Sequence, residues 1–211
     1  MPVQQHQILL AEAAWDAVQI PLRQAQRGRS MAQLALCGAA RFEQWRHYPA
    51  TDARDAQHGS QFYFHAHAQP RCKGEHGHFH LFQRAAQPGS AAFHHLVALS
   101  IDALGRPLRW FTTNAWVTGE QWLPASALCE LLPRYTLVQR GRLAPLARWL
   151  QSLVRLHAAE LARLLRQRDA ALARAARGRS LDALLQDRQL QLLSQREIRL
   201  AQRLQDLTPL T

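Results

Sequence analysis

The apolar positions of the N-terminal third follow the period of a helix. A first group at helical spacing predicts an amphipathic helix that stops before Pro21: Ile8, Leu9, Ala13, Trp15 and Val18. Ser30 and Gln33 then form a capping-box pair, which predicts that a second helix begins there. We expect that helix to end by Tyr48, because Pro49 disfavours helical geometry in the residue before it.

The middle of the chain changes to short aromatic and β-branched runs, which are typical of strands. Four such runs lie at residues 61–67, 76–82, 93–101 and 108–113. Segments that contain glycine, proline and polar residues separate them, as expected for turns. The pattern therefore predicts a four-stranded antiparallel meander.

From Pro124 onward the helical period returns. An apolar stripe predicts one long helix over residues 146–177, Gly178 is typical of a helix stop, and Ser180 of the next N-cap. Leucines between residues 190 and 207 predict a second helix that pairs with the first as an antiparallel hairpin. The fold class expected is α+β, with N-terminal helices, a four-stranded antiparallel meander and a long C-terminal helical hairpin.

Length and charge divide the chain into two parts. We expect helices and a histidine-rich sheet over residues 1–133, which form the core that bears the site, and an arginine-rich helical hairpin over residues 134–211. The second part carries +9 of the total net charge of +11, and we expect it to pack on the core or to mediate a homodimer. A basic helical face can bind nucleic acid, but an arginine-for-lysine bias is also typical of high-GC coding sequence. Nucleic acid is therefore the less favoured partner.

Three further features bear on location. No apolar run reaches the roughly 18 to 20 residues that a membrane span needs, and the first residues lack the pattern of a secretory signal. The cysteines, Cys37, Cys72 and Cys129, are scattered and form no disulfide framework. We expect a cytoplasmic protein.

The histidines are concentrated in one stretch of the chain. Eight of the eleven lie between residues 58 and 95, and five fall within sixteen residues: His65, His67, His76, His78 and His80. Neutral imidazole is the commonest protein ligand for metals and the side chain best suited to proton transfer near neutral pH. Alternating histidines can also be the polar face of a sheet or bind metal adventitiously. Five of them at period two across two predicted strands favour a built site.

The geometry of paired strands tests whether these histidines can meet. Residues two apart share one face of a strand, and opposed residues of an antiparallel pair point the same way. One register places every imidazole of the group on one surface through three opposed pairs: His67 with His76, His65 with His78, and Tyr63 with His80. A slip of one residue sends the two sets to opposite faces, and the loop length allows either register.

Three histidines from adjacent strands suit a transition metal with an open coordination position. Their donor nitrogens can lie ~2.0–2.1 Å from one ion, which leaves room for water or substrate. We favour His65, His67 and His78 as the core set, with His76 or His80 as the next candidate. Iron is the first candidate metal, followed by zinc and copper.

Two other residues beside the histidines are candidate catalytic groups. Glu75 precedes His76 and can complete a two-histidine-one-carboxylate set that favours Fe(II), or it can orient an imidazole from behind. The hydroxyl of Tyr63 would line the same surface. Gly77 leaves one face of its strand without a side chain, so another group can approach closely there.

A second unusual segment follows the fourth strand. Asn114, Trp116 and Glu120 place polar groups beside large aromatic rings, as a cofactor or ligand pocket requires. The alternative is a buried polar turn under a tryptophan lid.

Smaller candidates surround these segments. His94 and His95 are adjacent, so one of them can join the site while the other meets solvent. Asp52 and Asp55 can supply a carboxylate or can cap turns.

Three motifs occur together in residues 40–125. They are His47-Tyr-Pro with Asp52 and Asp55; Ser60-Gln-Phe-Tyr-Phe-His-Ala-His67 followed by Gly74-Glu-His-Gly-His-Phe-His80; and Phe111-Thr-Thr-Asn114 with Trp116-Val-Thr-Gly-Glu120. Together they resemble an uncharacterised bacterial family, a domain of unknown function, and the histidine string is the most specific part. The resemblance implies no particular reaction, and the arginine-rich tail lies outside it.

These observations leave three functional hypotheses. The first is a metal-dependent enzyme, redox or oxygen-using, that acts on a small-molecule substrate. The second is a non-enzymatic metal or ligand binder, such as a sensor, carrier or store. The third is a basic helical interaction module in which the histidines are incidental.

Overall fold

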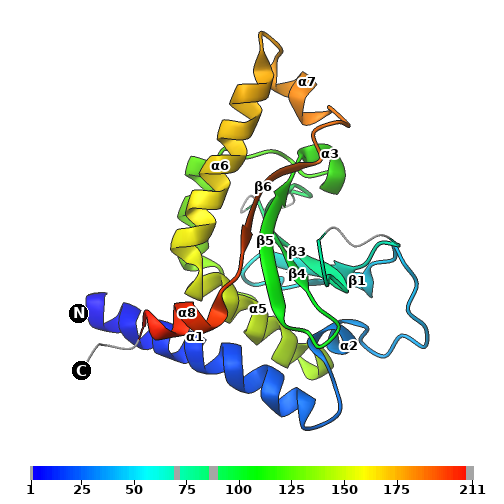
Figure 1. Ribbon diagram of the computed structural model, residues 1–211, viewed down its shortest axis with the longest axis vertical. Helices are drawn as coiled ribbons and strands as arrows, with labels where there is room; N and C mark the ends of the chain where they lie inside the picture. Colours follow the sequence, from blue (N-terminus) through cyan, green and yellow to red (C-terminus); the bar gives the residue numbers. More distant parts are fainter. Residues whose placement is uncertain (1, 69–71, 86–89, 208–211) are drawn as a thin grey trace.

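The computed structural model describes residues 2–68, 72–85 and 90–207, and one six-stranded antiparallel sheet forms its centre (Figure 1). The strands lie side by side in sequence order: β1 (Tyr48–Arg54), β2 (Ser60–His65), β3 (Gly77–Arg84), β4 (Phe93–Ile101), β5 (Pro107–Thr113) and β6 (Leu192–Glu197). Between β5 and β6 the chain leaves the sheet and forms most of the helices.

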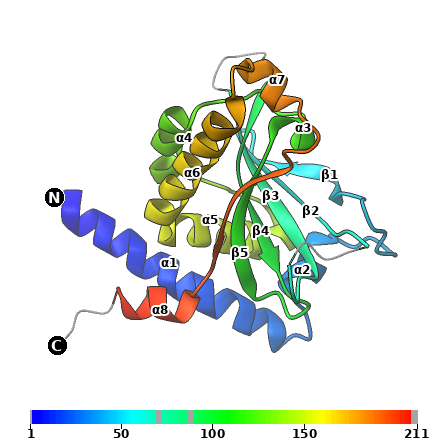
Figure 2. The same cartoon turned by 45° about the horizontal axis from the view of Figure 1, so that its top comes forward.

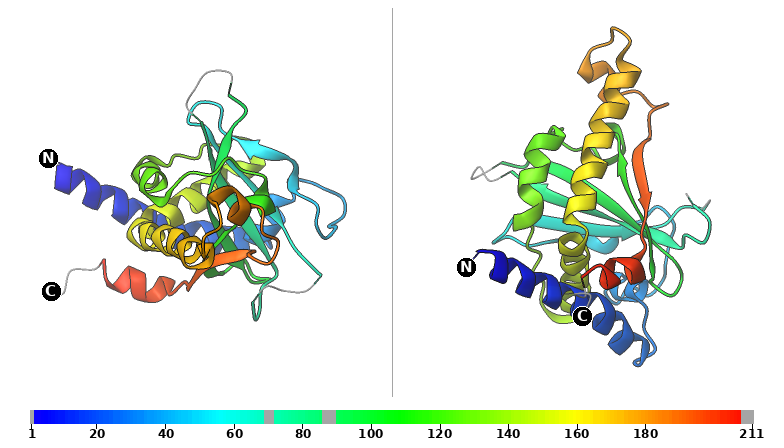
Figure 3. Two further views of the ribbon diagram at one scale, coloured as in Figure 1. Left: turned by 90° about the horizontal axis from the view of Figure 1, so that it is seen from above. Right: turned by 60° about the vertical axis from the view of Figure 1, so that its left-hand side comes forward.

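The longer helices cover one face of this sheet (Figures 2 and 3). The longer ones are α1 (Pro2–Ala25), α4 (Ala125–Leu131), α5 (Ala144–Leu156) and α6 (Ala158–Ala176). The shorter ones are α2 (Met31–Ala35), α3 (Ala115–Thr118), α7 (Leu181–Leu185) and α8 (Leu200–Gln205), with 3-10 turns at Leu132–Arg134 and Gly141–Leu143. α1 packs along α5, and α6 lies beside α4 and β6. Within the described ranges, no helix has both the length and the apolar character needed to cross a membrane.

Strand alternation gives the sheet two chemically different faces. Phe64 of β2 and Phe79 of β3 belong to the apolar core under the helices, where Phe79 meets Trp149 of α5 with 6.2 Å between ring centroids. The intervening positions carry His65 and His78, which therefore point to the opposite face. We call this the histidine face. Burying each phenylalanine side chain contributes roughly 1.5–3 kcal/mol to the stability of the fold. A shift of the strand register by one residue would turn these rings away from the core, so it would be strongly disfavoured.

The α+β class and the four predicted strands are confirmed, but the strand count is wrong because β1 and β6 extend the sheet at both edges. No strand was predicted over the residues of β1, which include Pro49 and Asp52. An edge strand tolerates proline because one side of its backbone needs no ladder partner. β1 also has an irregular register between Tyr48 and Ala53.

The prediction of a second long helix in a C-terminal hairpin is wrong. α6 ends as expected before Gly178, and Ser180 caps a helix, but that helix is the short α7. The chain then forms β6, which covers the otherwise unpaired edge of β5. Ser194 fixes this strand in place: its hydroxyl lies 2.6 Å from Thr112 Oγ1 and donates to the Leu164 carbonyl of α6 at 2.9 Å.

The N-terminal helices also depart from the prediction. α1 continues through Pro21 to Ala25, because its last turns still bury Ile20 and Gln24. The Ser30 capping box is confirmed, but α2 ends at Ala35, far short of Tyr48.

The residues after α2 form a loop instead of a continued helix. Cys37 and Trp45 have positive φ angles of 49° and 68°, which no helix accommodates. The Tyr48 hydroxyl ties the loop down, since it accepts from the Glu43 N–H at 2.6 Å and donates to the Arg41 carbonyl at 3.1 Å.

Candidate metal centre

Three histidines of β2 and β3 converge on the histidine face. The ladder pairs His65 with His78 and Tyr63 with His80, which is the register that brings the predicted set together. The Nε2 atoms of His65 and His78 lie 2.7 Å apart. One ligand atom from each of His65, His78 and His80 lies within 4.8 Å of the other two, a spacing that can hold a metal ion.

Glu75 orients the His78 ring through the nitrogen that faces away from His65. Its Oε1 lies 2.7 Å from His78 Nδ1, so the other ring nitrogen is turned toward His65. The remaining oxygen accepts from Ser100 Oγ at 2.9 Å and lies 3.5 Å from Arg109 Nη2. Burial pulls the pKa of Glu75 up, but the hydrogen bond and charge of His78 and the hydrogen bond from Ser100 outweigh it, and the net shift is downward. The carboxylate therefore stays charged, as in the carboxylate–histidine pairs behind metal sites.

His80 has a corresponding partner in β4. Its Nδ1 lies 3.0 Å from His95 Nε2, and His95 Nδ1 lies 3.5 Å from Thr113 Oγ1. Burial, and then the charge of Arg168, lowers the pKa of His95 to about 3, so this imidazole is neutral. A neutral partner can hold the His80 ring without adding positive charge to the cluster.

The adjacent His94 does not meet solvent as expected. It is buried, and its Nδ1 lies 2.6 Å from the Gln121 carbonyl oxygen.

The other two predicted histidines occupy different positions. The His67 ring follows β2 and stays near the cluster, with its centroid 4.8 Å from that of His65 and 5.0 Å from that of His78. His76 is exposed, and its ring stacks on Phe42 with 6.2 Å between centroids. The structure therefore brings His67 beside the set but does not bring His76 into it.

Tyr63 stands beside the histidines in a ring stack. Its ring lies parallel to that of His47, with centroids 3.6 Å apart, and its centroid is 5.1 Å from that of His80. Burial raises the pKa of Tyr63 strongly, and the charges of Asp52 and Glu120 add to the effect. Asp52 also holds His47, with 3.2 Å between Oδ1 and Nδ1.

A pocket of about 250 Å³ opens onto this cluster. The described residues that line it come from the loop before β1, from β2 and the residues just after it, from β3 and β5, from α3, and from the position just before β6: Trp45, His47, Tyr63, His65, His67, His80, Phe111, Thr113, Trp116, Val117 and Gln191. Two of the three clustered imidazoles, those of His65 and His80, therefore face the pocket directly.

The three predicted cofactor-binding residues have separate roles. Trp116 lines the pocket, and its Nε1–H donates to the Leu190 carbonyl at 3.1 Å. Asn114 is fully buried and caps α3, accepting from Ala115 N at 2.9 Å. Glu120 is buried and is not among the described residues that line the pocket; it accepts from the backbone N–H of His95 at 2.5 Å. Burial raises the pKa of Glu120 to about 8, against the lowering effects of the His95 N–H and of Arg168.

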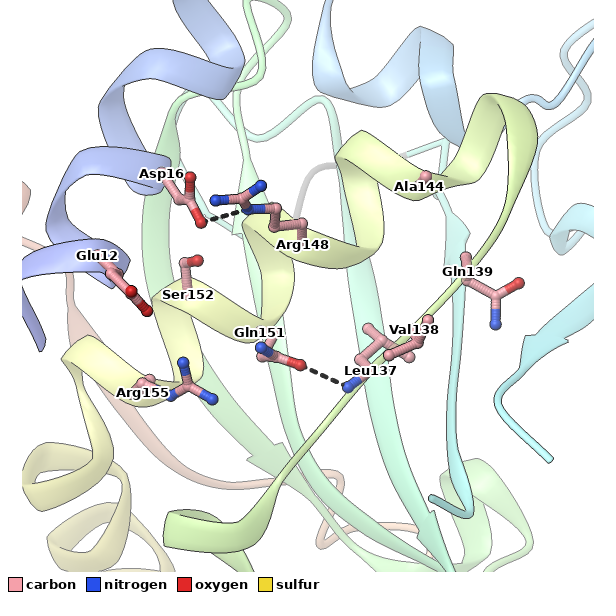
Figure 4. A pocket seen from close by; sticks show the side chains of 10 residues that line it. All are labelled: Glu12, Asp16, Leu137, Val138, Gln139, Ala144, Arg148, Gln151, Ser152 and Arg155. Carbon is pink, nitrogen blue, oxygen red and sulfur yellow. Dashed lines mark hydrogen bonds and ion pairs between the residues drawn. The ribbon is translucent and has the colours of Figure 1, made fainter. Parts of the chain in front are cut away.

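A larger pocket of about 390 Å³ lies on the helical side, between α1, α5 and residues 137–139 (Figure 4). Its central charges are already paired, since Arg148 Nε donates to Asp16 Oδ2 at 2.5 Å. Gln151 is also engaged, because it accepts from Leu137 N at 2.7 Å. No histidine is among the described residues that line it. The chemistry therefore favours the smaller pocket.

Sequence reasoning missed several residues of the site. Arg109 and Ser100 complete the partners of Glu75, and Phe111 lies 5.2 Å from His78 between ring centroids. Alternation along β4 and β5 could have placed them on the histidine face, because Ser100 pairs with Arg109 and Ala98 with Phe111. Trp45 could not have been found in this way, since it was assigned to a helix.

Comparison with known proteins identifies the family of this chain but assigns no activity to it. The family model described as Domain of unknown function (DUF6969) matches residues 11–198. The chain belongs to this family. Membership confirms the resemblance to an uncharacterised family. The match is wider than residues 40–125, because it includes most of the arginine-rich tail that was expected to lie outside the resemblance, as well as the histidine cluster and β6. Searches of curated proteins and of solved structures found no match.

Proposed function

We propose that this protein is a metal-dependent enzyme that uses a transition metal held by His65, His78 and His80 in redox or oxygen chemistry. The observation that carries the proposal is the convergence of the three imidazoles beside a pocket. Donors held ~2.0–2.1 Å from a metal at right angles to one another lie about 2.9 Å apart. The 2.7 Å between the Nε2 atoms of His65 and His78 is close to that spacing.

The donor set supports an open site. Three protein ligands leave further coordination positions, which is what separates catalytic from closed structural sites. Glu75 is engaged with His78 Nδ1, so it acts as an orienting group and not as a further ligand. Its buried negative charge would strengthen His78 as a donor.

The metal we expect first is iron, followed by zinc and copper, since imidazole suits all three. The described residues that line the pocket include no carboxylate or lysine, so any general base would be a histidine outside the ligand set, His47 or His67. The Tyr63 hydroxyl lies at the same wall and can donate a hydrogen bond to a bound molecule.

Elemental analysis of the full chain, purified without a histidine tag, tests the metal site. We expect one metal ion per chain in the native protein and its loss in both His65→Ala and His78→Ala. Metal-free native protein whose fold is unaffected by these substitutions would contradict the proposal.

The second candidate is a non-enzymatic binder. The burial of two of the three ligands favours it, because His78 and His80 are 1% and 2% exposed and would retain an ion tightly. Spectroscopy of the loaded protein separates the two candidates. A change in the metal spectrum on addition of azide or nitric oxide, together with oxygen consumption, supports an enzyme, and a spectrum that no small ligand alters supports a binder.

A further inference from the structure

The walls of the pocket beside the cluster are mostly aromatic. Eight of its eleven described lining residues carry rings, and none is aspartate, glutamate, lysine or arginine. Arg109 of β5 is engaged elsewhere, since it bonds to Gln195 and lies 3.5 Å from Glu75. Away from the proposed metal, a buried anionic group would therefore meet only imidazoles and no permanently charged side chain along these walls, at a considerable cost in desolvation.

The two tryptophan rings have contacts of their own before any ligand arrives, although Trp45 is 64% exposed. The hydrogen bond of Trp116 to Leu190 fixes the indole, and the Arg188 guanidinium lies 4.6 Å from its ring centroid. The Trp45 ring contacts His67 edge-on, with centroids 4.0 Å apart, and its backbone N–H donates to the Ala66 carbonyl at 2.9 Å. Fixed aromatic surfaces bind a flat ring with little loss of side-chain entropy.

The size of the pocket limits what can enter. A cavity of roughly 150 Å³ is enough to hold benzene. The 250 Å³ of this pocket leaves room for one such ring with small substituents. Polar contacts are available from the hydroxyls of Tyr63 and Thr113 on the same walls.

We propose that the pocket binds a small uncharged molecule with a single aromatic ring, a phenol, whose hydroxyl oxygen points toward His65 and His80. The direction of the hydroxyl rests on the proposed metal site, whereas the choice of an uncharged aromatic ring follows from the walls alone. The ring would lie among the side chains of Trp45, Phe111 and Trp116.

A series of small ligands tests the chemical class. Phenol, cyclohexanol and benzoate are titrated into the full-length untagged protein, and binding is followed by saturation-transfer NMR and calorimetry. Cyclohexanol keeps the size and the hydroxyl but lacks the aromatic face, and benzoate keeps the ring but adds a charge. Because aromatic contacts add ~0.5–1.5 kcal/mol beyond area burial, we expect phenol to bind up to about tenfold more tightly than cyclohexanol. Equal binding of phenol and cyclohexanol, or tighter binding of benzoate, would overturn the proposal.

Two substitutions at Trp116 locate the binding. Trp116→Phe and Trp116→Leu both remove the hydrogen bond to Leu190, but only the leucine removes the ring. We expect phenol affinity to fall in Trp116→Leu and to be largely kept in Trp116→Phe. Trp15→Leu, an exposed tryptophan of α1, is the matched control and should change nothing. Full affinity in a folded Trp116→Leu protein contradicts the assignment, and if that variant does not fold, the ligand series on the native protein decides.

The metal and the ring are measured separately so that the two proposals can fail separately. Phenol binding is repeated after the metal has been removed with a chelator. Metal bound through the histidines together with no preference for aromatic ligands would sink this inference and leave the metal proposal intact. Preference for phenol in a chain that holds no metal would sink the metal proposal and leave the choice of an uncharged aromatic ring intact.

Discussion

His65 and His78 face each other across the β2–β3 ladder with their Nε2 atoms 2.7 Å apart. Each ring is held by its own strand, and Glu75 fixes the far nitrogen of His78 at 2.7 Å. The ladder and the phenylalanines on the opposite face hold both backbones in place. A metal would therefore meet donors that are already oriented, so little of its binding energy would be spent on ordering the site.

Removing the charge of Glu75 should weaken metal binding without abolishing it. Glu75→Gln keeps the size of the side chain but loses the carboxylate that faces His78 Nδ1. Because such supporting groups contribute 10–100-fold to metal affinity, we expect a rise in Kd of about that factor, measured by competition with a chelator. Glu43→Gln, at an exposed carboxylate that pairs with Arg46, serves as the control. An unchanged Kd in Glu75→Gln would show that the carboxylate does not support the metal.

His76 and His78 are two residues apart but should respond differently to substitution. His76 is exposed and stacks on Phe42, whereas His78 is 1% exposed and belongs to the converging set. We expect His76→Ala to keep the full metal content by elemental analysis and His78→Ala to lose it. Loss of the metal from both variants would mean that the loop before β3 rearranges around the ion.

The contrast between these two histidines shows what the sequence could predict. Period-two spacing correctly assigns residues within a strand to one face, and it yields the pairing of His65 with His78. It does not say where the strand ends. β3 begins at Gly77, so His76 lies outside the ladder and its side chain is free to turn toward Phe42.

Elements that depend on distant partners were the harder part of the fold. Leu192–Glu197 has a leucine pattern that suits a helix, but the open edge of β5, some eighty residues earlier in the chain, makes it a strand. Trp45 lies within the helix that was predicted to run to Tyr48, yet it has a positive φ and lines the pocket. In both places tertiary contacts outweigh a local propensity worth only tenths of a kcal/mol per residue.

Gly77 is a position where a single methyl group should be costly. A Cβ there would lie 2.5 Å from Phe64 Cζ and 2.8 Å from the His65 carbonyl oxygen, and Phe64 is 1% exposed. Because overpacking of this kind costs about 1–3 kcal/mol, we expect Gly77→Ala to lower the free energy of unfolding by that amount in urea titrations.

A double substitution tests the reason for that loss. Phe64→Leu removes the ring atoms nearest to the added methyl group, so the cost of Gly77→Ala should be smaller in that background. Strictly additive costs would place the strain in the His65 backbone and not in the Phe64 ring.

Glu120 should make the stability of the protein depend on pH in an unusual direction. Burial raises its pKa to about 8 from an ordinary value of 4.5, so the folded state keeps a proton that the unfolded state releases between these pH values. The stabilisation is complete below pH 4.5 and is lost as the pH rises toward 8, with a slope of at most about 1.4 kcal/mol per pH unit.

Glu120→Gln mimics the protonated side chain and can still accept from the His95 N–H. In urea titrations at pH 5, 6.5 and 8, we therefore expect the variant to be closest in stability to the native protein at pH 5 and to become progressively more stable than it toward pH 8. Parallel stability curves would show that Glu120 is ionised throughout this range, and they would place a buried negative charge directly behind His95.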